Sequence, residues 1–81
     1  METALVDPRD QTWEIEDPVF RVYFHDQRGT SSEYEVRGAQ VDEVLDWAAR
    51  VADGRTFVLY VCVPDEGIGL VRLLGQDPNA A

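Results

Sequence analysis

Residues 41–63 carry the sequence VDEVLDWAARVADGRTFVLYVCV, in which a helical pattern gives way to a strand pattern. In the first half, apolar residues recur at helical spacing and form one stripe, made of Val41, Val44, Leu45, Ala48, Val51 and Ala52. Gly54 is a natural stop for this helix, because glycine accepts the left-handed conformation that commonly ends one. Residues 56–63 are apolar on both faces and rich in β-branched and aromatic side chains, which is typical of a strand inside a sheet. The stretch therefore predicts a helix over residues 41–53 and an interior strand over 56–63.

Two alternating runs precede the helix. Residues 19–25 place Phe20, Val22 and Phe24 on one face, with polar or half-polar residues on the other. Residues 31–37 alternate in the same way, and a turn that contains a glycine separates the two runs. Two such runs around a short glycine-containing loop predict a β-hairpin.

Two further strands are predicted at the ends of the chain. A Pro-Asp-Glu-Gly turn leads from the interior strand to a partner over 68–74, in which Gly69 marks an expected β-bulge. Residues 12–16 alternate briefly, with Trp13 and Ile15 on one face, and predict either a short strand or an extended arm that packs on the core.

These elements predict a small single α+β domain of order ββαββ, a four-stranded and largely antiparallel sheet with one helix packed on one face. The domain is expected over residues 12–75, between flexible tails at 1–11 and 76–81. The sheet face away from the helix is open unless the arm or a second subunit covers it. The predicted core consists of the inward residues Phe20, Val22, Phe24, Tyr34, Val36, Leu45, Phe57, Leu59, Val61, Leu70 and Leu73. The strand order does not follow from these patterns.

The charge balance restricts the classes of partner. The 81 residues include 16 acidic and 7 basic residues, for a net charge of −9. A nucleic-acid ligand and an anionic membrane surface are disfavoured, since both require a cationic protein face. A protein partner with a basic surface is favoured, and the alternative is that the acidity serves only solubility.

Cysteine usage and the lack of targeting segments indicate a cytoplasmic protein. Cys62 is the single cysteine, so no internal disulfide can form. The first ten residues are acidic and lack the apolar segment of a signal peptide, and the apolar run over 57–63 is too short to span a bilayer. The absence of lysine beside seven arginines is typical of G+C-rich bacterial coding.

Residues with chemical potential do not combine into a catalytic or metal signature. His25, Asp26 and Ser31 could imitate a hydrolytic triad, but a surface turn provides neither the rigid frame nor an oxyanion hole. One cysteine and one histidine cannot make a zinc site, and Gly67-Ile68-Gly69 lacks the helix that a phosphate loop requires. We therefore expect no enzyme activity, no cofactor and no metal.

The candidate binding residues lie on the polar faces of the first strands. Glu33 and Glu35 form one carboxylate row, Glu14 belongs to a second, and Tyr23 is an aromatic on a polar face. Three functions remain open. The first is an acidic protein-binding module, such as a stoichiometric inhibitor, an immunity- or antitoxin-like neutraliser, or a regulatory adaptor. The second is a structural or homo-oligomeric subunit, such as a homodimer, that pairs through the open sheet face. The third is a small-ligand or enzyme domain.

Overall fold

The computed structural model describes residues 1–10, 16–64 and 66–76. The strand or arm predicted over 12–16 and the tail predicted over 76–81 lie almost wholly outside the described residues. Within the predicted tail over 1–11, a short 3-10 helix, η1, forms at Pro8–Asp10.

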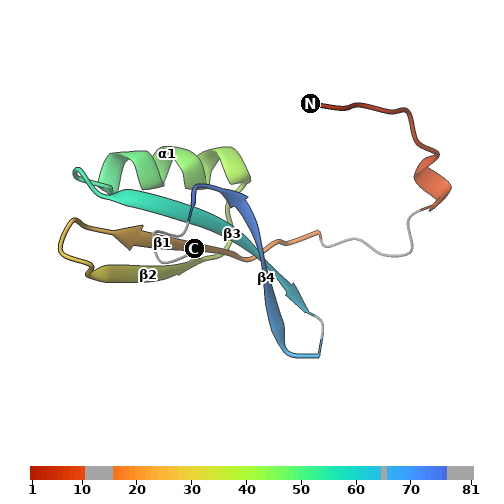
Figure 1. Ribbon diagram of the computed structural model, residues 1–81. Helices are drawn as coiled ribbons and strands as arrows, with labels where there is room; N and C mark the ends of the chain where they lie inside the picture. The colour runs from red at the N-terminus through yellow and green to blue at the C-terminus, as the bar shows by residue number, and fades with distance from the viewer. Residues whose placement is uncertain (11–15, 65, 77–81) are drawn as a thin grey trace.

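The predicted fold class is confirmed: four strands and one helix follow one another in the order ββαββ (Figure 1). The elements are β1 (Phe20–His25), β2 (Ser31–Val36), α1 (Val41–Val51), β3 (Thr56–Pro64) and β4 (Ile68–Leu74). The sheet order is β2-β1-β3-β4, and every neighbouring pair is antiparallel. Because β1 lies between β2 and β3, those two strands run parallel to each other, and α1 connects them across β1.

The turn between β1 and β2 is organised by one carboxylate. The Asp26 carboxylate accepts hydrogen bonds from the backbone N–H groups of Arg28 and Thr30, both at 2.9 Å. Gly29 lies in the left-handed region with φ +82°, as expected for this turn. Both bonds are accepted by Oδ1, so the turn fixes the orientation of the Asp26 carboxylate.

The start of α1 is fixed by a reciprocal contact between the N-cap residue and the first turn. The backbone N–H of Gln40 donates to the Glu43 carboxylate at 2.9 Å, and the Val44 N–H donates to the Gln40 carbonyl at 3.1 Å. This geometry is that of a capping box, in which a side chain of the first turn satisfies the N-cap backbone.

The helix ends at Val51, two residues before its predicted end, because Asp53 already adopts a positive φ of 50°. The side chain of Arg55 then satisfies the carbonyls that a helix end leaves without intrahelical partners. Its Nε donates to the Ala52 carbonyl and its Nη2 to the Val51 carbonyl, each at 2.8 Å. A cation at this position also interacts favourably with the helix dipole.

The core is centred on Phe24, whose side chain is fully buried. The rings of Tyr34 and Trp47 lie edge-on to it at 5.7 Å between centroids, and Phe57 lies at 5.8 Å. The Arg55 guanidinium lies 4.6 Å from the centroid of the Phe24 ring. Phe24 therefore joins β1 to β2, α1 and β3, and to the segment that follows the helix.

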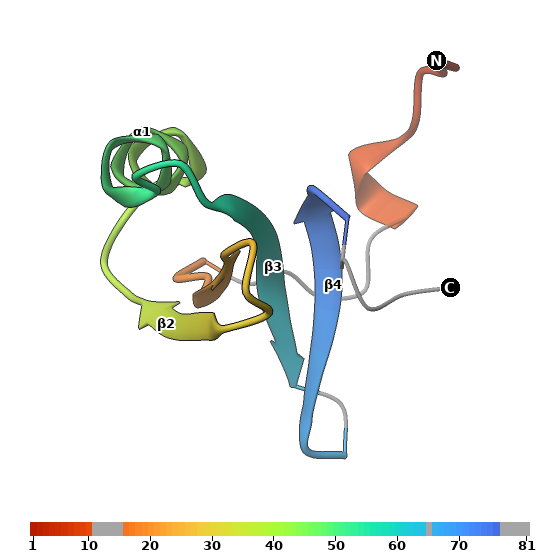
Figure 2. The same ribbon diagram turned by 60° about the vertical axis from the view of Figure 1, so that its left-hand side comes forward.

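The described core excludes β4, which corrects part of the predicted core. The buried cluster consists of Phe20, Val22, Phe24, Val44, Ala48, Ala52 and Leu59. The prediction that Tyr34 is a core residue is wrong, because it is 46% exposed although its ring contacts Phe24. The prediction that Leu70 and Leu73 are core residues is also wrong, since they are 37% and 48% exposed. The reason is that α1 lies over the other strands and does not reach β4 (Figure 2).

The irregularity in the sheet lies at a different residue from the predicted bulge. Gly69 pairs regularly with Val63, and the register of β3 with β4 shifts between Leu59 and Tyr60. Beyond this shift Gly75, with φ +88°, lies tightly against the β3 backbone. A Cβ at this position would lie 2.5 Å from the carbonyl oxygen of Phe57.

We expect Arg55→Met to lower the free energy of unfolding by about 1.5–3 kcal/mol, because two charge-assisted hydrogen bonds are lost together with the ring contact. Arg50→Met is the matched control, since Arg50 is exposed and makes one long contact with its own helix, at 3.4 Å. It should cost less than about 0.5 kcal/mol. Urea denaturation measures both, and equal losses would contradict the capping role of Arg55.

We expect Gly75→Ala to destabilise the fold more than Gly29→Ala. Both positions have a positive φ, so each alanine bears a conformational cost of about 1–2 kcal/mol. Only at position 75 would the new methyl group also meet backbone atoms, while open space surrounds it at position 29. Thermal denaturation of the two variants measures the cost of the clash at position 75, because the conformational cost is common to both. Identical midpoints would show that Gly75 does not pack against β3.

Candidate functional site

The sheet has one face that the described helix does not cover. Figure 2 shows α1 on one side of β1, β2 and β3, so the helix leaves their other side uncovered. We call this second side the open face. Its side chains come from the alternate residues of the strands, among them Arg21, Tyr23, His25, Glu33, Glu35, Tyr60, Cys62, Leu70 and Arg72. Val58 lies on the same side of the sheet but is buried, at 1% exposed.

Two tyrosines occupy the centre of the open face. Tyr23 on β1 and Tyr60 on β3 are diagonal neighbours, because Tyr23 pairs with Val58 and Arg21 with Tyr60. Their ring centroids are 5.1 Å apart at an angle of 54°, and both side chains are half-buried. Aromatic pairs of this kind combine apolar area with a polar tip, and such residues are enriched at protein interfaces.

Glu35 lies between two arginines. Its carboxylate is 3.7 Å from Nη2 of Arg21 and 3.1 Å from Nε of Arg37. The pKa of Arg21 is raised, mainly by its side-chain hydrogen bond with Tyr23 and less by the charge of Glu35. Glu35 is therefore already engaged within the chain, so it orients the arginines more than it offers a free charge to a partner.

Glu33 is the more available carboxylate of the row. It faces Tyr23 across the β1–β2 ladder and is exposed. Among the interactions of the described residues, Glu33 accepts one long hydrogen bond, from the Ser31 hydroxyl at 3.5 Å. An incoming guanidinium or ammonium group can therefore pair with Glu33 without displacing an internal cation.

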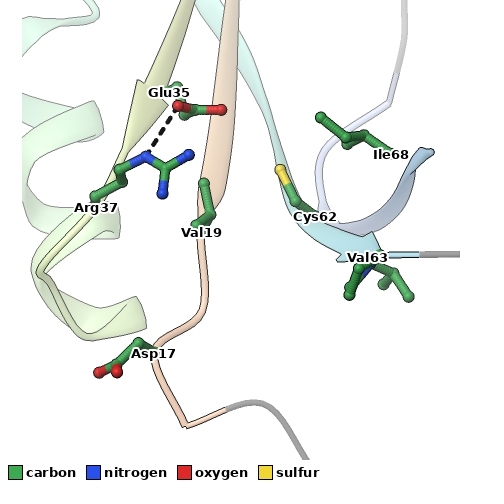
Figure 3. A pocket seen from close by; sticks show the side chains of 8 residues that line it. Asp17, Val19, Glu35, Arg37, Cys62, Val63 and Ile68 are labelled. Carbon is green, nitrogen blue, oxygen red and sulfur yellow. Dashed lines mark hydrogen bonds and ion pairs between the residues drawn. The ribbon is translucent and has the colours of Figure 1, made fainter.

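Two shallow hollows adjoin each other on this face, and Glu35 borders both. One has a volume of about 270 Å³ and is mostly apolar (Figure 3). Its lining consists of Asp17, Val19, Glu35, Arg37, Cys62, Val63, Pro64 and Ile68. The other has a volume of about 320 Å³ and is lined by Arg21, Tyr23, Glu33, Tyr34 and Glu35. An apolar site and a polar site are thus placed side by side.

The structure brings three of the four predicted site residues onto one face. Tyr23, Glu33 and Glu35 lie together, whereas Glu14 falls outside the described residues. Neither the position of Arg21 in the site nor the apolar hollow around Cys62 was predicted from the sequence. Tyr60 lies in the strand predicted over 56–63, but its contact with Tyr23 depends on β1 and β3 being neighbours, which the strand order reveals.

Three other features were sought in the described part of the chain: a hydrolytic triad, a metal site and a membrane-spanning helix. His25 pairs with Ser31 at the end of the β1–β2 ladder, but Asp26 is bound to its own turn. No group of three or more metal-ligating side chains occurs among residues 1–10, 16–64 and 66–76. Within the same residues, no helix has the length and apolar character needed to cross a membrane.

Comparison of the chain with protein-family models, with curated proteins and with solved structures found no match. The function is therefore argued from the geometry of the open face.

Cys62 provides a chemical probe of the apolar hollow. It is a free thiol in the hollow's wall and is half-buried. We expect iodoacetamide to alkylate the folded protein at this one site, more slowly than the urea-unfolded chain, because reaction requires access to the thiolate. Mass spectrometry over time measures both rates. Equal rates would mean that the hollow does not shield Cys62.

Proposed function

We propose that this chain is a small, acidic, non-enzymatic protein-binding module that engages a basic partner surface through its open face. A stoichiometric inhibitor, an immunity- or antitoxin-like neutraliser and a regulatory adaptor are all modules of this kind. The observation that carries the proposal is the pair of Tyr23 and Tyr60 beside the exposed carboxylate of Glu33, on a face that no described helix covers.

The shallow shape of the two hollows favours a protein ligand over a small molecule, because neither hollow encloses a ligand. Pockets for drug-sized ligands have volumes of about 300–1,000 Å³ and bury most of the ligand. The apolar hollow measures about 270 Å³ and is shallow, so it suits one aliphatic side chain of a partner. The adjoining polar hollow offers Glu33 and the Tyr23 ring to a cationic side chain. The expected partner therefore presents an arginine or lysine close to an aliphatic residue.

Charge and burial contribute differently to such a complex. The net charge of −9 attracts a basic partner and raises the rate of encounter. Desolvation of the tyrosine pair and filling of the apolar hollow supply most of the affinity, since buried aromatic anchors dominate interface energies. We further propose that this module is cytoplasmic, because the reducing cytoplasm suits a protein with one unpaired thiol and no disulfide.

Charge reversal at Glu33 tests the proposal. Peptides selected from a random phage-displayed library on the wild-type protein should carry a cationic residue near an aliphatic one. We expect Glu33→Arg to weaken their binding at least about ten-fold, because close charge pairs couple strongly at interfaces. The matched control is Asp46→Arg, which changes the net charge equally but lies exposed on α1. It should retain most of the binding.

The same peptides allow two further measurements, the salt dependence of the association rate and the rate of Cys62 alkylation. Association should slow as salt rises, because the Debye length falls from about 10 Å at 0.1 M to about 3 Å at 1 M. Bound peptide should also slow alkylation of Cys62, which lines the apolar hollow. Selected peptides without cationic residues, or equal binding by the Glu33→Arg variant, would contradict the proposal.

A further inference from the structure

β4 has the composition of a buried strand but the exposure of a surface one. Its sequence is Ile68-Gly-Leu-Val-Arg-Leu-Leu74, with one charged residue and no proline. Its five large aliphatic side chains are all more than one-third exposed: Ile68 65%, Leu70 37%, Val71 49%, Leu73 48% and Leu74 45%. Together they expose roughly 400 Å² of apolar surface, divided between the two faces of the strand.

The exposure extends to both faces of the strand. Val71 pairs with Val61 and shares its face of the sheet, the face that α1 covers. Leu70 pairs with Cys62 and lies on the open face. None of the β4 residues belongs to the buried cluster, and the helix ends short of this strand (Figure 2). In the described chain, the ladder with β3 is therefore the main contact of β4.

The two edges of the sheet differ in how they are protected. β2, the opposite edge, carries Glu33 and Glu35 and is followed by Arg37, and charges of this kind discourage a second strand from pairing. β4 has one arginine and a register shift at its carboxyl end, which leaves Ile68–Arg72 regular. Within the described residues no strand pairs with the outer edge of β4.

Charge limits which surface two copies of this chain can share. Each copy has a net charge of −9, so most contacts would bring carboxylates together. The sequence over 67–76 contains no acidic residue and includes Arg72. A second copy can therefore approach along β4 without facing a row of carboxylates.

We propose that two copies of this chain form a symmetric dimer by antiparallel pairing of their β4 strands, which joins the two sheets into one. Such an interface is isologous, because the same strand meets itself across a two-fold axis. The axis lies near Val71, the middle residue of β4, so that Ile68 of one copy approaches Leu74 of the other. The dimer leaves the charged β2 edges outermost, which closes the assembly at two copies.

The area defines the expected strength of this dimer. Standard interfaces bury about 800 Å² from each partner. The aliphatic side chains of β4 supply roughly half of that, and the paired backbones add to it. We therefore expect a weak, concentration-dependent dimer, in the class of small transient interfaces. This dimer uses the sheet edge, whereas the sequence alone suggested pairing through the open face. Tyr23 and Glu33 lie on β1 and β2, away from this edge.

Sedimentation equilibrium over a concentration series that reaches the millimolar range tests the dimer. The wild-type mass should rise from one copy to two, and no further. Val71→Lys should weaken the dimer at least about ten-fold, because two cations would then face each other near the axis. The matched control is Val41→Lys, the same change at a valine of similar exposure on α1, 44% against 49%. It should dimerise as the wild type does.

Salt distinguishes this dimer from the proposed complex with a basic partner. Screening reduces the repulsion between two acidic copies, so salt should strengthen the dimer while it slows binding of a basic peptide. A monomeric mass throughout, a mass that grows beyond two copies, or equal dimerisation of the two lysine variants would overturn the dimer. None of these results would affect the Glu33 test.

Hydrogen exchange of the wild type keeps the dimer testable if Val71→Lys does not fold. The amides on the outer edge of β4 should exchange more slowly at high protein concentration, because the second copy then pairs with them. Amides of β2, the other edge, serve as the internal control and should not change. Exchange of the β4 amides that is independent of concentration would overturn the dimer.

Discussion

The fold depends on the packing around Phe24. Rings from β2, α1 and β3 contact this one buried side chain, and the guanidinium that caps α1 lies against it as well. A chain of this length buries a small fraction of its surface compared with larger domains, so one such centre carries much of its stability. The capping of the helix and the packing of the sheet are thereby coupled, since Arg55 takes part in both.

The position of α1 determines the character of every other surface. The helix is short, and it covers the strands on which Phe20, Val22 and Leu59 lie. The face behind these strands remains available for the tyrosine pair and the carboxylate row, and β4 remains outside the core altogether. The two proposed interfaces therefore have one structural cause: a single helix is too small to cover a four-stranded sheet.

The sequence predicted the elements well, because hydrophobic periodicity is a local property. The alternation around Phe24 and the apolar stripe of α1 placed all five main elements close to their observed bounds. Leu70 and Leu73 were misplaced because alternation identifies a strand without telling whether a helix reaches it. The site was predicted in part for a similar reason. Tyr23 and Glu33 lie opposite each other in one hairpin, which is a local feature of the sequence. Tyr60 lies beside Tyr23 because β3 pairs with β1, and this pairing joins segments that are far apart in the sequence.

The attachment of β4 has a consequence for how the molecule fluctuates. Proteins open in cooperative units, and a unit with few buried contacts opens at lower free energy than the rest. The outer strand is joined to β3 by its ladder and contributes no side chain to the core. We therefore expect the edge strand to open at a lower free energy than the helix and the three remaining strands.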